Sequence, residues 1–262
     1  MLLRRKPRAG GYAEQRYREG LRSWRARIRP SAAAIFGPFI VAGIAVLFLD
    51  GHQLSWLAGM ATGAFIGAWL AVRETPPDYV ENWHIGAEGE RKAEKALRPL
   101  ERADWRVFHD VQNGHGNYDH IVVGPGGVYL LESKNLGGIV GITDGVPHLQ
   151  RRLDPKDDKP WESIPRYARA AAAGLKEEIE QRTGRCIWVQ AVVVFWSEFP
   201  EAFVKADNCV FIEGSRLCAW LQSQPDRLPD ADVEEISAGI AGLADKAAAA
   251  DGASRSSELS PV

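Results

Sequence analysis

The segment spanning residues 118–134 constrains the fold of this chain more than any other part of the sequence. It consists of two apolar runs separated by a Gly-Pro-Gly-Gly sequence, which predicts two antiparallel strands joined by a turn. With a four-residue loop, Val123 pairs with Val128. Counting back along both strands then places Asp119 directly opposite Glu132.

Two carboxylates facing each other across neighbouring strands need a compensating charge. Their Cβ atoms would be roughly 4.5–5.5 Å apart, and like charges at that distance repel unless a cation or a proton lies between them. Lys134 lies two residues beyond Glu132 and therefore points to the same face. Such a set can hold a divalent metal and polarise a water, as phosphodiester hydrolysis requires. The alternative is that Asp119 and Glu132 are solvated carboxylates with Lys134 as an ordinary salt-bridge partner.

Two segments, 31–49 and 54–72, contain no charged residue over 19 positions each. This is close to the ~20 residues that a helix needs to cross a bilayer. The polar turn between them predicts a transmembrane hairpin over 31–72, and a buried soluble hairpin is the alternative. Glycines at every fourth position from Gly59 to Gly67 allow helices to approach closely, either within the hairpin or in a homodimer.

The ends of the chain differ in charge. Residues 1–30 carry ten Lys or Arg against two Glu, a net charge of +8 in a chain whose total is −2. By the positive-inside rule this basic segment stays in the cytoplasm, and two spans return the chain to the same side. We therefore expect a multi-pass protein of the cell (plasma) membrane with both termini cytoplasmic. The alternative function of the basic segment is contact with an anionic membrane surface or nucleic acid. Three widely spaced cysteines without a CxxC pair agree with a reduced cytosolic domain, in which we expect them to pack in or near the core.

The rest of the chain divides by pattern into a linker, a compact α/β domain and a C-terminal region. Residues 73–83 contain two prolines and predict the linker. Residues 84–224 predict the domain, and residues 225–262 a C-terminal helix followed by a disordered tail. Within the domain, apolar periodicity predicts helices over 86–100 and 164–182, strands over 105–111, 188–196 and 208–212 beside the hairpin, and a short strand and turn over 137–144.

Three motifs occur in a fixed order: Gly86-Ala87-Glu88-Gly89-Glu90, then Tyr118-Asp119-His120, then Glu132-Ser133-Lys134-Asn135 followed by Gly137-Gly138. This ordered set resembles the nuclease-related domain called NERD, which is placed by similarity in the PD-(D/E)XK nuclease superfamily. The resemblance covers about residues 84–200. It implies an α/β fold with a restriction-endonuclease-like core, a mixed sheet flanked by helices, here preceded by the two-helix transmembrane hairpin.

The resemblance also implies roles for individual residues. Asp119 and Glu132 match the carboxylates that ligate Mg²⁺ (or Mn²⁺), and the backbone carbonyl of Ser133 matches a further metal ligand. Lys134 matches the lysine that orients or deprotonates the attacking water. Glu90 matches the helix glutamate that reaches toward the metal or its waters. Mg²⁺ suits this set because it keeps several waters and takes only one or two carboxylates.

The sequence departs from the family pattern at one element. Many members carry Asn-Pro-x-x-Gln at the start of the later helix, whereas the matching stretch here is Ile164-Pro165-Arg166-Tyr167-Ala168. The polar Asn and Gln are absent, so any positioning of a substrate phosphate would depend on Arg166 and Arg169. His120 follows Asp119, points to the opposite face and is expected to have a packing role.

Two functions follow from these observations. The first is a membrane-anchored, Mg²⁺-dependent endonuclease that hydrolyses phosphodiester bonds in DNA, in preference to RNA. The second is a catalytically inactive nuclease-like domain that acts as a membrane-tethered binding or scaffold module. The acidic balance of the domain favours the second, because nucleic-acid binders usually present a basic surface.

Overall fold

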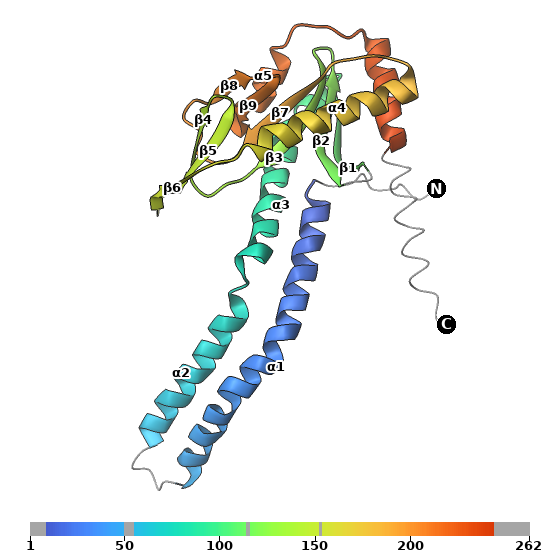
Figure 1. The fold of residues 1–262 in the computed structure, drawn as a ribbon. Coiled ribbons are helices and arrows are strands. Elements are labelled where there is room, and N and C mark those ends of the chain that lie inside the picture. The colour runs from blue at the N-terminus through green and yellow to red at the C-terminus, as the bar shows by residue number, and fades with distance from the viewer. Residues whose placement is uncertain (1–8, 50–54, 114–115, 152–153, 244–262) are drawn as a thin grey trace, which may run out of the picture. The chain divides into compact units, whose positions relative to one another are not determined.

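The computed structural model describes residues 9–49, 55–113, 116–151 and 154–243 (Figure 1). The chain divides into two compact units, split after Tyr12 and between His84 and Ile85. One unit is the helical segment 13–84. The other combines the described residues 9–12 with the chain from Ile85 onward. The predicted disordered tail, 251–262, lies outside the described residues.

The helical unit is a hairpin of α1 (Gly11–Leu49) and α2 (Ser55–Glu74), followed by the first residues of α3 (Asp78–Leu97). Phe39 of α1 stacks on Phe65 of α2, with ring centroids 4.6 Å apart. The two helices are therefore in direct contact within this unit. The described part of the basic segment 1–30, from Gly11, continues as one helix into the apolar stretch.

The predicted transmembrane hairpin is not confirmed. Among the described residues, no single helix is both long and apolar enough to cross a membrane. Two consecutive pieces, Gly11–Ile28 and Ala33–Val46, meet the length and composition requirement together but are bent by 52°. The apolar part of α2 is the shorter segment Gly59–Val72. Among the described residues, the glycine face from Gly59 to Gly67 makes no close contact, since a Cβ added at these glycines would meet no described atom within 4 Å.

The second unit is built on a six-stranded mixed sheet with strand order β1-β2-β3-β7-β9-β8. The strands are β1 Arg106–Gln112, β2 Asn117–Gly124, β3 Gly127–Lys134, β7 Val189–Phe195, β8 Phe203–Ala206 and β9 Cys209–Glu213. Strands β2 and β3 pair in the predicted register, with Val123 opposite Val128 and His120 opposite Leu131. The predicted hairpin and its register are confirmed, but Gly124 also pairs with Gly127, so the turn has two residues rather than the four expected.

Strand β3 pairs in parallel with β7, which requires a long crossover between them. The crossover contains α4 (Ser163–Thr183) and a small antiparallel sheet of β4 (Ile139–Thr143), β5 (Val146–Arg151) and β6 (Asp154–Pro160). Sequence patterns predicted α4 and a short strand in the region of β4. They did not predict β5 or β6.

Each face of the large sheet carries its own apolar core, because the inner strands point side chains alternately to both faces. In β7, Val193 and Phe195 belong to one core, and Val192 and Val194 belong to the other. The first core is covered by α4 and a helix over 230–243. The second core contains the end of α3 and α5 (Leu217–Gln222). These helices fix the sheet, and thus the ends of β2 and β3, in place.

Two boundaries and one burial prediction differ from expectation. Helix α3 begins at Asp78 rather than 86, so it includes most of the predicted linker. The helix over 230–243 belongs to the core of the domain, where Ile236 and Ile240 are fully buried. The expectation that the cysteines lie in or near the core is confirmed for Cys209, which is buried, and wrong for Cys186, which is exposed.

Candidate active site

Asp119, Glu132 and Lys134 meet where β2 begins and β3 ends. Continuing the register by one residue from the His120–Leu131 pair places Asp119 opposite Glu132, as the sequence predicted. The backbone amide of Ser133 donates a hydrogen bond to Asp119 Oδ2 at 3.0 Å. The Nζ of Lys134 contacts Glu132 Oε1, so these two side chains share a face. The hairpin therefore brings the three predicted polar residues together.

Glu90 reaches the same site from α3. The helix approaches the end of β3 closely at Gly89, where an added Cβ would lie 2.9 Å from the Cβ of Asn135. Any larger residue at this position would push the helix away. Glu90 is only 9% exposed, whereas Glu88 is solvent-facing and pairs with Lys92 at 3.1 Å on the outer side of the helix. Of these two glutamates, Glu90 is the one that faces the site.

The carboxylates of the site interact strongly with one another. Burial, and then the charges of Glu132 and Glu90, raise the pKa of Asp119 well above its usual range. Burial and the charge of Asp110 raise the pKa of Glu90 to about 7. Burial alone would lower the pKa of Lys134, but the neighbouring carboxylates reverse this and raise it. Three carboxyl groups thus share one lysine, which leaves an excess of negative charge when all are ionised.

This excess is what a bound cation would neutralise. Among the described residues, no group of three or more His, Cys, Asp or Glu side chains is arranged to hold a metal ion. The donor set nevertheless fits Mg²⁺ or Mn²⁺, since Asp119 and Glu132 supply hard carboxylate oxygens in a site with too little positive charge. Two carboxylates and several waters satisfy Mg²⁺ without a third protein side chain.

The side chain of Ser133 faces away from these carboxylates. Its hydroxyl accepts a hydrogen bond from Trp196 Nε1 at 2.9 Å and lies beside Gly89 of α3. A metal-ligand role for Ser133 would therefore use its backbone carbonyl, as the family resemblance implies.

Asp110 is a site residue that sequence reasoning missed. It lies in β1 with a positive φ of 54°, and no partner on β2 is paired with it, although His109 and Val111 on either side are paired. This local irregularity directs a carboxylate toward Glu90, whose pKa it raises. Asn117 donates to Asp110 Oδ1 at 2.8 Å. The feature that marks Asp110 as a site residue is its left-handed backbone conformation, which cannot be read from the sequence.

Residues near the N-terminus also reach the site. The backbone amide of Gly10 donates to Glu90 Oε2 at 2.7 Å, and this contact is buried. The amide of Tyr12 donates to Asp110 Oδ2 at 3.0 Å. Two of the acidic side chains thus accept hydrogen bonds from a segment that lies about 80 residues or more away in sequence. The sequence patterns gave no indication of this contact.

His120 is fully buried, which agrees with its predicted packing role. Its Nδ1 lies 2.7 Å from the Nδ1 of His109 on the paired strand. Burial lowers the pKa of His120 to about 3, so the ring is neutral near pH 7. His120 therefore supplies no positive charge to the neighbouring carboxylates, whereas the charge of His109 lowers the pKa of Asp110.

The two arginines considered as phosphate contacts have other partners. The guanidinium of Arg166 lies over the Tyr167 ring, 5.3 Å from its centroid. Arg169 donates to the backbone oxygen of Asp207 at 3.4 Å. Neither arginine contributes to the pKa shifts of Asp119 or Glu90. Their proposed compensation for the missing Asn and Gln thus has no support from these contacts.

Residues 85–196 match the family described as the nuclease-related domain, NERD. The chain therefore contains a nuclease-related domain over this range, which runs from α3 through the end of β7. The mixed α/β fold, a six-stranded sheet flanked by helices, fits a nuclease-like core. No curated protein and no solved structure shows a significant match to this chain.

Proposed function

We propose that this protein is a membrane-anchored, Mg²⁺-dependent nuclease that hydrolyses phosphodiester bonds in DNA, or in RNA. One observation carries the proposal: half-buried Asp119 lies beside Glu132 and Glu90, and the three carboxyl groups share the cation Lys134. Such a cluster is unfavourable for a purely structural role, because each ionised carboxylate opposes ionisation of the others. The same cluster is favourable for binding a divalent cation.

The metal ligands in this proposal are Asp119, Glu132 and the carbonyl of Ser133. A bound Mg²⁺ or Mn²⁺ supplies Lewis-acid polarisation of a phosphoryl oxygen and lowers the pKa of a coordinated water. These functions need an acidic, partly enclosed site with open positions for water and phosphate. The mutual pKa effects of the carboxylates provide the acidic part of that requirement.

The remaining residues act on protons and charge. Lys134 is a compact cation that would orient the attacking water and offset negative charge on the phosphate. Glu90 has a pKa of about 7, so it can gain or lose a proton near neutral pH. A group with such a pKa is suited to general acid–base work. For Glu90 to act in this way, its oxygen must be released from the Gly10 amide.

Anchoring to the cell membrane is proposed for the helical unit, with both termini in the cytoplasm. Its support is the large apolar side chains that α1 and α2 leave exposed, among them Val41 at 66%, Phe48 at 85% and Met60 at 62%. A soluble protein rarely exposes a continuous apolar surface of this kind. The glycine face of α2 is open to a second copy of the chain, and a homodimer would provide the two sites that double-strand cleavage needs.

The alternative function is a tethered binding or scaffold module without turnover. The contacts at Glu90 favour it, because the Gly10 amide already occupies one of its oxygens. The carboxylate of Glu132 is likewise in contact with Lys134. In this function the acidic cluster would be stabilised by protons and hydrogen bonds alone.

Plasmid cleavage by the full chain in detergent separates these functions. Supercoiled DNA is incubated with Mg²⁺, Mn²⁺ or EDTA, and a single-stranded RNA is tested in parallel. We expect Asp119→Asn and Glu132→Gln to reduce nicking at least about 100-fold, the order of magnitude for loss of a group that stabilises transition-state charge. The matched control is Glu88→Gln on the outer side of α3. Metal-independent nicking, or equal activity in all variants, would contradict the nuclease proposal.

A further inference from the structure

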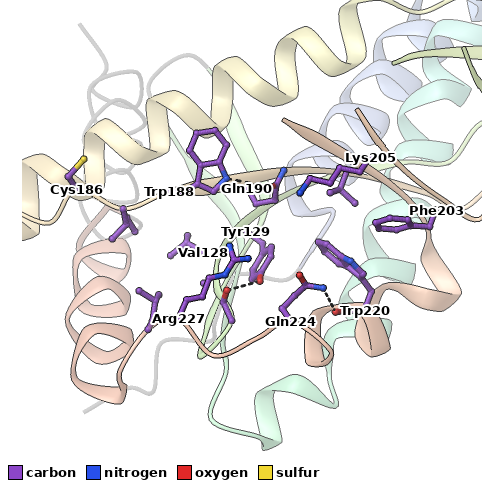
Figure 2. A pocket seen from close by; sticks show the side chains of 15 residues that line it. Val128, Tyr129, Cys186, Trp188, Gln190, Phe203, Lys205, Trp220, Gln224 and Arg227 are labelled. Atoms are coloured by element: carbon purple, nitrogen blue, oxygen red, sulfur yellow. Dashed lines mark hydrogen bonds between the residues drawn. The ribbon is translucent and has the colours of Figure 1, made fainter. Parts of the chain in front are cut away.

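A cavity of about 440 Å³ lies at the start of β3, the opposite end of that strand from the carboxylates (Figure 2). Its walls come from residues 126–129, the segment 186–190 that leads into β7, parts of β8 and β9, and the residues after α5. Its volume lies in the range of small-molecule sites. None of the candidate active-site residues lines this cavity.

Aromatic rings form two sides of the cavity. Trp220 is held by the edge of Tyr129, with centroids 5.6 Å apart, and by Phe203 at 6.1 Å. Trp188 is 57% exposed, and its indole N–H donates to Gln190 Oε1 at 3.3 Å. In Figure 2 the rings of Tyr129, Trp220 and Phe203 lie together, and the Trp188 ring lies apart from them on the side of α4. An exposed indole at the edge of a cavity is suited to stacking on a planar aromatic ligand.

The charged groups of the cavity are all positive. Lys205 and Arg227 line it, and no Asp or Glu is among the lining residues. In the part of the chain that the structure describes, neither cation forms an ion pair with a carboxylate. Burial raises the pKa of Tyr129 and the charge of Arg227 partly offsets this, which places the guanidinium near the phenol. An anionic group would therefore find two uncompensated cations here.

A hydrogen-bond acceptor lies beside the aromatic wall. The Nε2 of Gln224 donates to the backbone oxygen of Trp220 at 3.0 Å. This bond fixes the amide and leaves its carbonyl oxygen available to a donor on a ligand. The cavity thus combines a stacking surface, a fixed acceptor and two cations.

We propose that this pocket binds a nucleotide unit, with the base stacked on Trp188 and the phosphate near Arg227 and Lys205. A free mononucleotide and the terminal nucleotide of a strand present this same chemistry. The proposal rests on the cavity alone and does not require hydrolysis. Tyr129 and Glu132 are three residues apart along β3, about 10 Å, so a nucleotide held here is not the one at the carboxylates.

Calorimetry on the full chain in detergent with EDTA tests the proposal. AMP, adenosine, inorganic phosphate and 5′-phosphorylated tetrathymidylate are titrated separately. We expect AMP to bind at least tenfold more tightly than adenosine or phosphate. Trp188→Ala and Arg227→Gln should each weaken AMP binding about tenfold or more. The controls are Tyr79→Ala, an exposed aromatic outside the cavity, and Arg102→Gln, while Glu132→Gln should bind AMP like the wild type.

The outcomes are distinguishable from those of the nuclease proposal because no metal is present. Tighter binding of the tetranucleotide than of AMP would identify a strand end as the ligand, and the reverse would identify a free nucleotide; both support the pocket. No binding of AMP at millimolar concentration would overturn the proposal. Equal binding by wild type, Trp188→Ala and Arg227→Gln, or phosphate binding as tight as AMP binding, would also overturn it.

Discussion

Asp119 and Glu90 are carboxylic acids whose surroundings favour the protonated form. The pKa of Glu90 rises from 4.5 to about 7, first through burial and then through Asp110. A raised folded-state pKa stabilises the fold at low pH. This contribution is complete below the unfolded value and is lost as the pH rises through the folded value. Without metal, the domain should therefore become less stable between about pH 4.5 and 7.

Glu90→Gln tests this pH dependence. The neutral amide cannot ionise, so the variant should lose less unfolding free energy than the wild type as the pH rises over this window. The difference is at most roughly 3 kcal/mol, from the size of the pKa shift. Urea unfolding of the full chain in detergent with EDTA, between pH 4.5 and 8, measures it. Glu88→Gln is the control and should follow the wild type; an equal pH slope for Glu90→Gln would contradict the assignment.

Sequence predicted the residues whose positions depend on strand register. The distance of Asp119 and Glu132 from a single turn determines their pairing, so counting residues was enough. Asp110 could not be predicted, because its direction depends on a positive φ at one strand residue. The Gly10 contact could not be predicted either, because a backbone amide carries no side-chain signal.

At the scale of the element, the Trp105 ring packs tightly against the turn of the β2–β3 hairpin. A Cβ added to Gly124 would lie 2.2 Å from atoms of the Trp105 ring. The backbone of the turn and this ring are thus packed without space for a methyl group. The hairpin carries Asp119 and Glu132, so its stability also determines the stability of the site.

Gly124→Ala should destabilise the domain by about 1–3 kcal/mol, because the added methyl group displaces the Trp105 ring. Gly137→Ala is the matched control, since a Cβ there would meet no described atom within 4 Å. Urea unfolding monitored by tryptophan fluorescence compares the two variants. Equal stability of both variants would show that the ring moves aside without cost.

The elements that sequence missed are those whose residues do not show the expected pattern. Strand β6 has the sequence Asp-Pro-Lys-Asp-Asp-Lys-Pro, which lacks apolar alternation and would be interpreted as a loop. It is a strand because it pairs with β5, for example Lys159 with Leu149. Cross-strand pairing overrides local preference in such segments. By contrast, the almost continuously apolar β7 was predicted within one residue at each end.

At the scale of the whole molecule, the proposed anchor predicts how the chain partitions. Wild-type protein should remain in the membrane fraction after extraction at alkaline pH. Val41→Arg places a charge within the first apolar segment, at a cost of about 2.5–3.5 kcal/mol at a bilayer centre, and should reduce the inserted fraction. Tyr79→Arg, outside both segments, is the control. Release of the wild-type chain by alkaline extraction would contradict the anchor.

Metal binding by the full chain tests the central claim most directly. Calorimetry in detergent at pH 7 titrates Mn²⁺ and Mg²⁺ into the wild type, Glu132→Gln and the Glu88→Gln control. Buffers of different ionisation enthalpy report the protons released. We expect saturable binding by the wild type and the control, with proton release from the Glu90–Asp119 cluster, and loss of both in Glu132→Gln. Absence of binding by the wild type, or equal binding by Glu132→Gln, would contradict a metal centre at Asp119 and Glu132.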